Sequence, residues 1–450
     1  MSEPLAAAAA EEAAGLLPLE LPKLPEPAAP ATPKRSMRFL VGSMATGNMI
    51  SALLSMVGGI LMMRLVAPKT LGLFTGIGLI QQYLPFLQIG VLNGMNRELP
   101  FFVGKGDHHR VRELASVAQA WALLLGGVSG LALLGVAAWQ LVLGQWWPAA
   151  GWATNAILAF LLFYKTWYLQ YTYRTSNDFA RLALATVVEN TVAFLLLGLV
   201  ALLNFYGMCF RVILAGLVGT ALLHYWRPVR VGPSWKFHHF KHLLAIGAPI
   251  FVVNQILSVW TPLNSNLVLW YMGTEGMGLY YVAITAVNAL EILPLAVGAV
   301  LYPRLAEQYG RTGNVHDLLR VATKPTAMTF AAMIPICILS WVLVGPVVAI
   351  VGPKYLGAVP AVQWSLLIPL LTSLTPVGLI FNVIRRQDLY LVAILLGIGS
   401  YFGSLRWLIS GGVSLIAFPQ AMAIGRLVYV VACYALVVHH RRRVIQTERA

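Results

Sequence analysis

The chain has 450 residues, of which 59% are hydrophobic and only 10% charged, and its mean hydropathy is +0.75. Soluble proteins are about 45–50% apolar and about 25% charged, so this composition excludes a water-soluble fold as the leading interpretation. The net charge of +15 is typical of nucleic-acid binding in a soluble chain, but in so apolar a chain it favours anionic lipid headgroups at one membrane surface. We therefore expect membrane lipids, and no nucleic acid, among the partners.

The first 36 residues differ in composition from the rest of the chain. They are rich in Ala, Pro and Glu and have no apolar periodicity, which predicts a disordered tail. Acidic Glu3, Glu11 and Glu12 stand where a signal peptide has basic residues. We expect no cleavage here, and the first spanning helix is retained.

Apolar stretches long enough to cross a membrane follow this tail. A hydrocarbon core about 30 Å thick requires about 20 apolar residues per helix. This length predicts an all-α membrane protein with about twelve spans, at 38–65, 71–95, 114–143, 150–173, 182–203, 207–225, 243–271, 276–302, 323–351, 358–384, 389–410 and 412–438. An even number of crossings places both termini on one side.

The positions of the Lys and Arg residues predict which loops lie on the cytoplasmic side of the membrane, because these residues concentrate in short cytoplasmic loops. Alternate loops and both tails hold most of the 31 Lys and Arg, whereas the opposite loops hold only Lys69 and Lys354. Both termini are therefore predicted to be cytoplasmic. The expected organisation is a tail at 1–36, a six-helix bundle at 37–226, a cytoplasmic linker at 227–242, a second six-helix bundle at 243–438 and a basic tail at 439–450.

An internal repeat relates the two halves when the chain is shifted by about 206 residues. Gly72 then meets Gly278, and Gly104 meets Gly310. The shift moves the first span onto the seventh, which has the same orientation, so the halves are parallel repeats about an axis along the membrane normal. This arrangement is typical of transporters in which the substrate path runs between the halves.

Polar residues recur along one face of the first and seventh spans. The first set is Asn48, Ser51 and Ser55, and the second is Asn254, Ser258, Thr261 and Ser265. These faces either pack against neighbouring helices through small polar residues or line a hydrated central cavity. Pro249 and Pro262 bracket the second set and predict a bent helix that can hinge.

Ionisable residues inside the spans are the stronger functional signal, because burying one near the bilayer centre costs about 2.5–3.5 kcal/mol or more. Lys165, Arg426, Glu189 and Glu291 are predicted to lie deepest, while Arg64, Arg211 and Arg406 lie near the outer ends and can also act as interface anchors. Internal ion pairing, for instance of Glu291 with Arg426, is the structural alternative. We predict that the five cations form a pathway for an anionic substrate and that Glu291 or Glu189 binds a coupling ion.

Motifs of enzymatic chemistry do not occur in the sequence. It contains no GxxxxGK[ST], HExxH or CxxC, and the cysteines, Cys209, Cys337 and Cys433, lie in apolar runs and read as core residues. The histidines at 108, 109, 238, 239 and 242 fall in basic cytoplasmic loops, where a solvated face is favoured over a metal site. We expect no cofactor, no metal and no enzyme activity.

Several segments resemble polysaccharide flippases of the Wzx type, in the multidrug/oligosaccharidyl-lipid/polysaccharide (MOP) superfamily. They are LMMRLVAPKTLGLF from Leu61, IGVLNGMNRELPFFVGKGD from Ile89, GMGLYYVA from Gly276, YPRLAEQYGRTGN from Tyr302 and VGPKYLGA from Val351. The resemblance covers about residues 37–440. It implies a MATE-like fold of two bundles around a cationic cavity, in a bacterial inner membrane.

The same resemblance implies a substrate and a mechanism. A lipid-linked oligosaccharide, carried on undecaprenyl pyrophosphate, would pass through the cavity by alternating access, with Lys165, Arg211 and Arg426 meeting the pyrophosphate. A polysaccharide polymerase or export machinery would be a partner. The alternatives are a multidrug exporter with an acidic cavity, a peptidoglycan-precursor flippase with fourteen helices, and a membrane-embedded glycan polymerase or ligase with a large outer loop.

Overall fold

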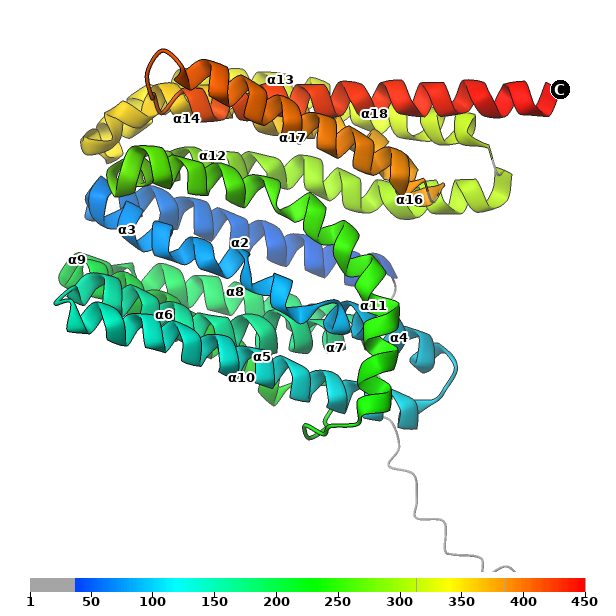
Figure 1. Ribbon diagram of the computed structural model, residues 1–450, viewed down its shortest axis with the longest axis horizontal. Helices are drawn as coiled ribbons and strands as arrows, with labels where there is room; N and C mark the ends of the chain where they lie inside the picture. Colours follow the sequence, from blue (N-terminus) through cyan, green and yellow to red (C-terminus); the bar gives the residue numbers. More distant parts are fainter. Residues whose placement is uncertain (1–36, 313, 385, 450) are drawn as a thin grey trace, which may run out of the picture.

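The computed structural model describes residues 37–449 apart from Gly313 and Arg385 (Figure 1). The predicted tail at 1–36 therefore lies outside the described residues. The part of the chain that is described is helical and contains no strand. The first half comprises α2 (Met37–Leu65), α3 (Pro68–Gly78), η1 (Leu79–Gln82), η2 (Leu84–Gln88), α4 (Val91–Gly104), α5 (His108–Val142), α6 (Trp146–Leu161), η3 (Leu162–Leu169), α7 (Gln170–Thr175), α8 (Phe179–Leu195), α9 (Leu197–Leu203) and α10 (Phe205–Tyr225).

The second half repeats this pattern of crossings. It comprises α11 (Phe237–Ser258), α12 (Trp260–Thr312), α13 (Val315–Val351), η4 (Pro353–Ala358), α14 (Val359–Ser365), α15 (Leu367–Thr372), η5 (Thr375–Gly378), α16 (Leu379–Val383), α17 (Gln387–Ile409) and α18 (Ala417–Arg449). The element labelled α12 contains two membrane crossings, because the chain turns at Gly273, where φ is 64°.

The prediction of twelve crossings in two six-helix bundles is confirmed. Nine segments of the described chain are long and apolar enough to span a membrane, and one of them, Pro262–Tyr309, contains the turn at Gly273. The first crossing contributes the shorter apolar segment Met49–Leu65. The remaining crossing consists of α3, η1, η2 and α4, and it breaks between η2 and α4, where the backbone is left-handed at Ile89 and Gly90, with φ of 49° and 104°.

Figure 1 shows the helices in layers, with α13, α14, α17 and α18 on one side and α5, α6, α8, α9 and α10 on the other. Between them α3 packs against α12, and α4 packs against α11. The helix α2 packs against α8 of its own bundle and also contacts α12. The interface between the bundles is therefore built by the first two crossings of each half.

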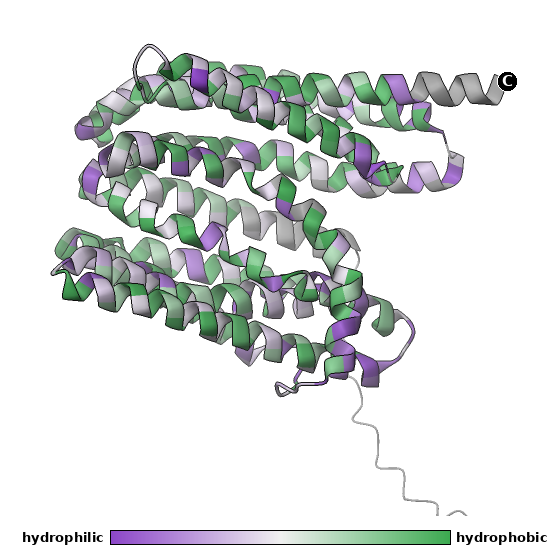
Figure 2. Cartoon of the chain, in the orientation of Figure 1, coloured by the Kyte–Doolittle hydropathy of each residue, from purple (hydrophilic) through white to green (hydrophobic). Residues whose placement is uncertain are grey.

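Hydrophilic residues gather at one end of the molecule (Figure 2). They cluster where α4 meets the start of α11 and where α12 turns into α13. The described chain also begins and ends at this end (Figure 1). The two ends of the described chain thus share one side, as an even number of crossings requires.

Glycines of the repeat bring the two bundles into backbone contact. A Cβ at Gly72 would overlap the carbonyl oxygen of Thr274, and a Cβ at Gly278 would overlap that of Pro68. The shift that maps Gly72 onto Gly278 also maps Pro68 onto Thr274, so the two contacts are the same contact seen from each half. The repeat therefore forms a pseudo-symmetric joint at which only glycine fits.

Replacing Gly72 by Val should destabilise this joint, because the new side chain would displace the backbone of α12. Overpacking costs about 1–3 kcal/mol and sometimes more, so the expected result is a lower melting temperature and a lower folded yield in detergent. Gly135→Val is the control, since a Cβ at that exposed position on α5 meets nothing within 4 Å. Equal melting temperatures for the two variants would contradict the joint.

Candidate functional site

The polar residues of the membrane region line three neighbouring cavities. The first, of about 310 Å³, lies in the N-terminal bundle between α6, η3, α8 and α10. The second, of about 290 Å³, lies between the bundles, where α2 faces the second crossing of α12. The third, of about 50 Å³, lies within the C-terminal bundle. We name them the N-cavity, the central cavity and the C-cavity.

Lys165 and Glu189 form an ion pair in the wall of the N-cavity. The distance from Lys165 Nζ to Glu189 Oε1 is 2.5 Å, and the two side chains are 13% and 26% exposed. Lys165 belongs to η3, a wide π-helical segment within the fourth crossing. Such segments are rare and are frequent at functional sites. The pair is accessible from the cavity, so its charges are not sealed in the protein interior.

The helix α10 completes the N-cavity. A Cβ at Gly219 would overlap Oε2 of Glu189, so the missing side chain provides the space in which the carboxylate lies. About two helical turns away on α10, Arg211 donates from Nε to the carbonyl oxygen of Ala193 over 2.7 Å. This carbonyl lies in the last turn of α8, where backbone acceptors have no partner in the helix. Arg211 is thereby held beside the cavity, which contains two cations and one carboxylate.

A hydrogen bond connects the N-cavity with the central cavity. Ser55 of α2 lines the central cavity and donates to Oδ1 of Asn190, which lines the N-cavity, over 3.0 Å. Across the central cavity, α12 contributes Thr285 and Asn288. This cavity lies at the boundary of the two bundles, as expected for a path between them.

The C-cavity brings Glu291 and Arg426 together without an ion pair. Glu291 Oε1 accepts a hydrogen bond from Thr372 over 2.8 Å, and the guanidinium carbon of Arg426 lies 5.0 Å from the ring centre of Trp260. Both side chains line the cavity, and both are described, yet no nitrogen of Arg426 lies within 4.0 Å of the carboxylate. The suggested pairing of Glu291 with Arg426 is therefore wrong. The deep ion pair is Lys165 with Glu189.

Asn288 connects the central cavity with the C-cavity, because it lines both. Lys165, Glu189, Asn190, Ser55, Asn288, Glu291 and Arg426 therefore form a continuous series of polar groups across both bundles, which we call the polar belt. Sequence reasoning missed Asn190 and Asn288. The sequence did contain a signal for both residues, because burying an amide side chain in an apolar span costs free energy unless the amide has a hydrogen-bond partner.

The other predicted site residues lie elsewhere. Arg64 and Arg406 are exposed in the last turns of α2 and α17, and neither is among the residues that line the three cavities. Ser51 is buried, and Ser258 donates to the carbonyl oxygen of Gln255. The side chains of Asn48, Asn254 and Thr261 lie outside the described part of the structure.

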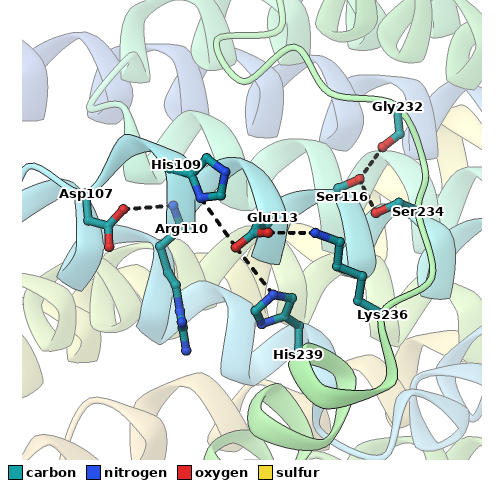
Figure 3. A network of polar contacts seen from close by, with 9 residues as sticks. All are labelled: Asp107, His109, Arg110, Glu113, Ser116, Gly232, Ser234, Lys236 and His239. Carbon is teal, nitrogen blue, oxygen red and sulfur yellow. Dashed lines mark hydrogen bonds and ion pairs between the residues drawn. The ribbon is translucent and has the colours of Figure 1, made fainter. Parts of the chain in front are cut away.

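The histidines at the hydrophilic end take part in a polar network (Figure 3). His239 is 8% exposed and contacts Glu113, which also accepts a hydrogen bond from Lys236. His242 contacts Glu98, which is 5% exposed. The expected solvated face is therefore wrong for His239, which is buried, whereas the side chain of His242 is 30% exposed. Their contacts join α4 and α5 to the start of α11, and no cluster of metal ligands is found among the described residues.

A sequence profile of a family of polysaccharide biosynthesis proteins matches residues 121–360, which is more than half of the chain. The chain belongs to this family. Comparison with curated proteins found no match by sequence.

The fold is that of MATE transporters of the MOP superfamily. An inward-facing multidrug resistance MATE transporter of this superfamily superposes with a TM-score of 0.68 at 16% identity, over 92% of this chain and 100% of the other. An outward-facing one gives 0.62 at 16% identity, over 93% and 98%. A MATE structure in complex with Br-NRF gives 0.59 at 16% identity, over 91% and 96%. The expected MATE-like fold is thus confirmed.

Proposed function

We propose that this family member is a flippase that moves a lipid-linked oligosaccharide, carried on undecaprenyl pyrophosphate, from the cytoplasmic to the outer leaflet of a bacterial inner membrane. The product would serve a cell-surface polysaccharide such as lipopolysaccharide or exopolysaccharide. The observation that carries the proposal is the placement of Lys165 and Arg211 beside one membrane-embedded cavity, in a chain of a polysaccharide biosynthesis family.

The charge of the N-cavity suits a pyrophosphate headgroup. Two cations face one carboxylate there, and charge-assisted hydrogen bonds from Lys and Arg are the strong contacts to phosphate oxygens. The volume of about 310 Å³ is at the lower end for ligand pockets. It therefore fits a headgroup and not a whole oligosaccharide, whose hydroxyl groups would contact the polar side chains of the central cavity.

The interface between the bundles supports transport by alternating access. The bundles at 37–226 and 243–438 are proposed to rock against each other about the glycine joint at Gly72 and Gly278. The higher TM-score to an inward-facing neighbour supports a cavity open to the cytoplasm, on the side of both termini. The isoprenoid tail would remain in the bilayer beside α2 and α12, and a polymerase or export complex would receive the product.

A multidrug exporter is the second candidate, because the structural neighbours include multidrug resistance transporters. An exporter of cationic drugs is expected to use an acidic cavity, so two cations against one carboxylate in the N-cavity favour the flippase. Deletion of the gene separates the two functions. A flippase mutant accumulates a lipid-linked glycan on the inner leaflet, and an exporter mutant becomes sensitive to cationic drugs.

Lys165→Ala and Arg211→Ala should each abolish polysaccharide export while the protein remains inserted in the membrane. Each change removes a cation that would meet the headgroup. Surface polysaccharide is measured with membrane abundance as a reference, and Arg311→Ala, which alters an exposed cation paired with Glu307, should export normally. Full export by both cavity variants would refute the assignment of the headgroup site.

Glu291→Gln should weaken the dependence of export on a proton gradient, because Glu291 is the proposed ion-coupling residue of the C-cavity. Its carboxylate has a single described hydrogen-bond donor, Thr372, and shares the cavity with Arg426. Export is measured with and without a protonophore. Unchanged sensitivity to the protonophore would exclude Glu291 as the coupling residue.

A further inference from the structure

The ion pair in the N-cavity creates a conflict with the headgroup. Lys165 Nζ is already bonded to Glu189 at 2.5 Å, so a phosphate can use this cation only by displacing a carboxylate. We infer that an anionic headgroup takes Lys165 from Glu189 and that Glu189 then takes up one proton, so that headgroup and proton bind together. This inference rests on the proposed function of the N-cavity.

The position of the ion pair at the cavity wall allows a ligand to reach Lys165. Both partners of the pair border the cavity and are partly exposed to it, so a ligand oxygen can approach Nζ from the open side. Arg211 stays in place during the exchange, because its Nε is bonded to the carbonyl oxygen of Ala193. Its guanidinium is always charged and provides a second contact for the same ligand.

The surroundings of Glu189 explain why the displaced carboxylate takes up a proton. The charged groups that line the N-cavity with it are Lys165 from η3 and Arg211 from α10, and both would be bound to the headgroup. The helix α2 contributes Ser55, which is uncharged and already donates its hydrogen bond to Asn190. Gly219 of α10 has no side chain that could bind the carboxylate of Glu189. An ionised carboxylate left without a partner inside a membrane protein is costly, and it neutralises instead.

The exchange balances in charge and in hydrogen bonds. The hydrogen bond from Lys165 Nζ to Glu189 Oε1 breaks, Nζ donates to a phosphoryl oxygen, and the carboxylate takes up one proton from the buffered solution. No bond to phosphorus forms or breaks. With Glu189 protonated, the occupied cavity carries one negative charge fewer than it would with Glu189 ionised, which lowers the cost of moving the headgroup through a low-dielectric path.

Calorimetry of farnesyl pyrophosphate binding to the full chain in lipid nanodiscs tests the inference. Titration at one pH in buffers of different ionisation enthalpy counts the protons taken up on binding. The wild type should take up about one proton more per ligand than Glu189→Gln, because the ligand's own titration is common to both. The dissociation constant of the wild type should also rise with pH more steeply than that of the variant, by up to about tenfold per pH unit, since one bound proton is linked to one ligand.

Two further variants control for a structural effect. Glu189→Asp keeps a titratable group and should retain the uptake, and Glu307→Gln makes the same chemical change at an exposed carboxylate and should also leave the count at the wild-type value. Infrared difference spectra of the wild type give an answer that does not depend on any variant, because binding should produce the stretching band of a protonated carboxyl group.

The outcomes separate the inference from the function on which it rests. Equal proton counts for the wild type and Glu189→Gln, or no protonated carboxyl band in the wild type, overturn the exchange while binding itself still supports the headgroup site. Failure of the wild type to bind farnesyl pyrophosphate overturns both.

Discussion

A charged or amide side chain in the hydrocarbon region has to face protein or water, because lipid offers it no hydrogen bond. This constraint organises the membrane part of the chain. Lys165 faces Glu189, Asn190 faces Ser55, and Glu291 faces Thr372. These polar groups, which the helices bring into the membrane, lie along the polar belt and line the cavities described above.

The internal repeat explains why the polar belt extends through both bundles. Equivalent glycines, Gly72 and Gly278, bring the bundles into backbone contact, and a second backbone contact joins Gly94 of α4 to Leu243 of α11. The central cavity lies between the bundles beside α2 and α12. The two bundles also differ in chemistry, because the N-cavity holds an accessible ion pair and the C-cavity holds an acid and a base that do not touch.

The sequence was sufficient to predict the crossings and the repeat, because span length, loop charge and glycine spacing are properties of the chain alone. It was not sufficient to predict which charges meet. The partner of Lys165 depends on the rotation of its helix, and the π-helical segment η3 changes that rotation in a way that a 3.6-residue period does not reveal. The burial of His239 likewise depends on how the start of α11 packs on α5.

Water access to the polar belt is the most direct test of this account. With the native cysteines replaced, Ser55→Cys should react with a membrane-impermeant thiol reagent in sealed vesicles of one orientation, because position 55 lines the central cavity. Leu131→Cys, at a position on α5 that is 71% exposed and would face lipid, should stay unreactive. If Ser55→Cys is as inert as Leu131→Cys from both sides of the membrane, there is no aqueous path between the bundles and the account is contradicted.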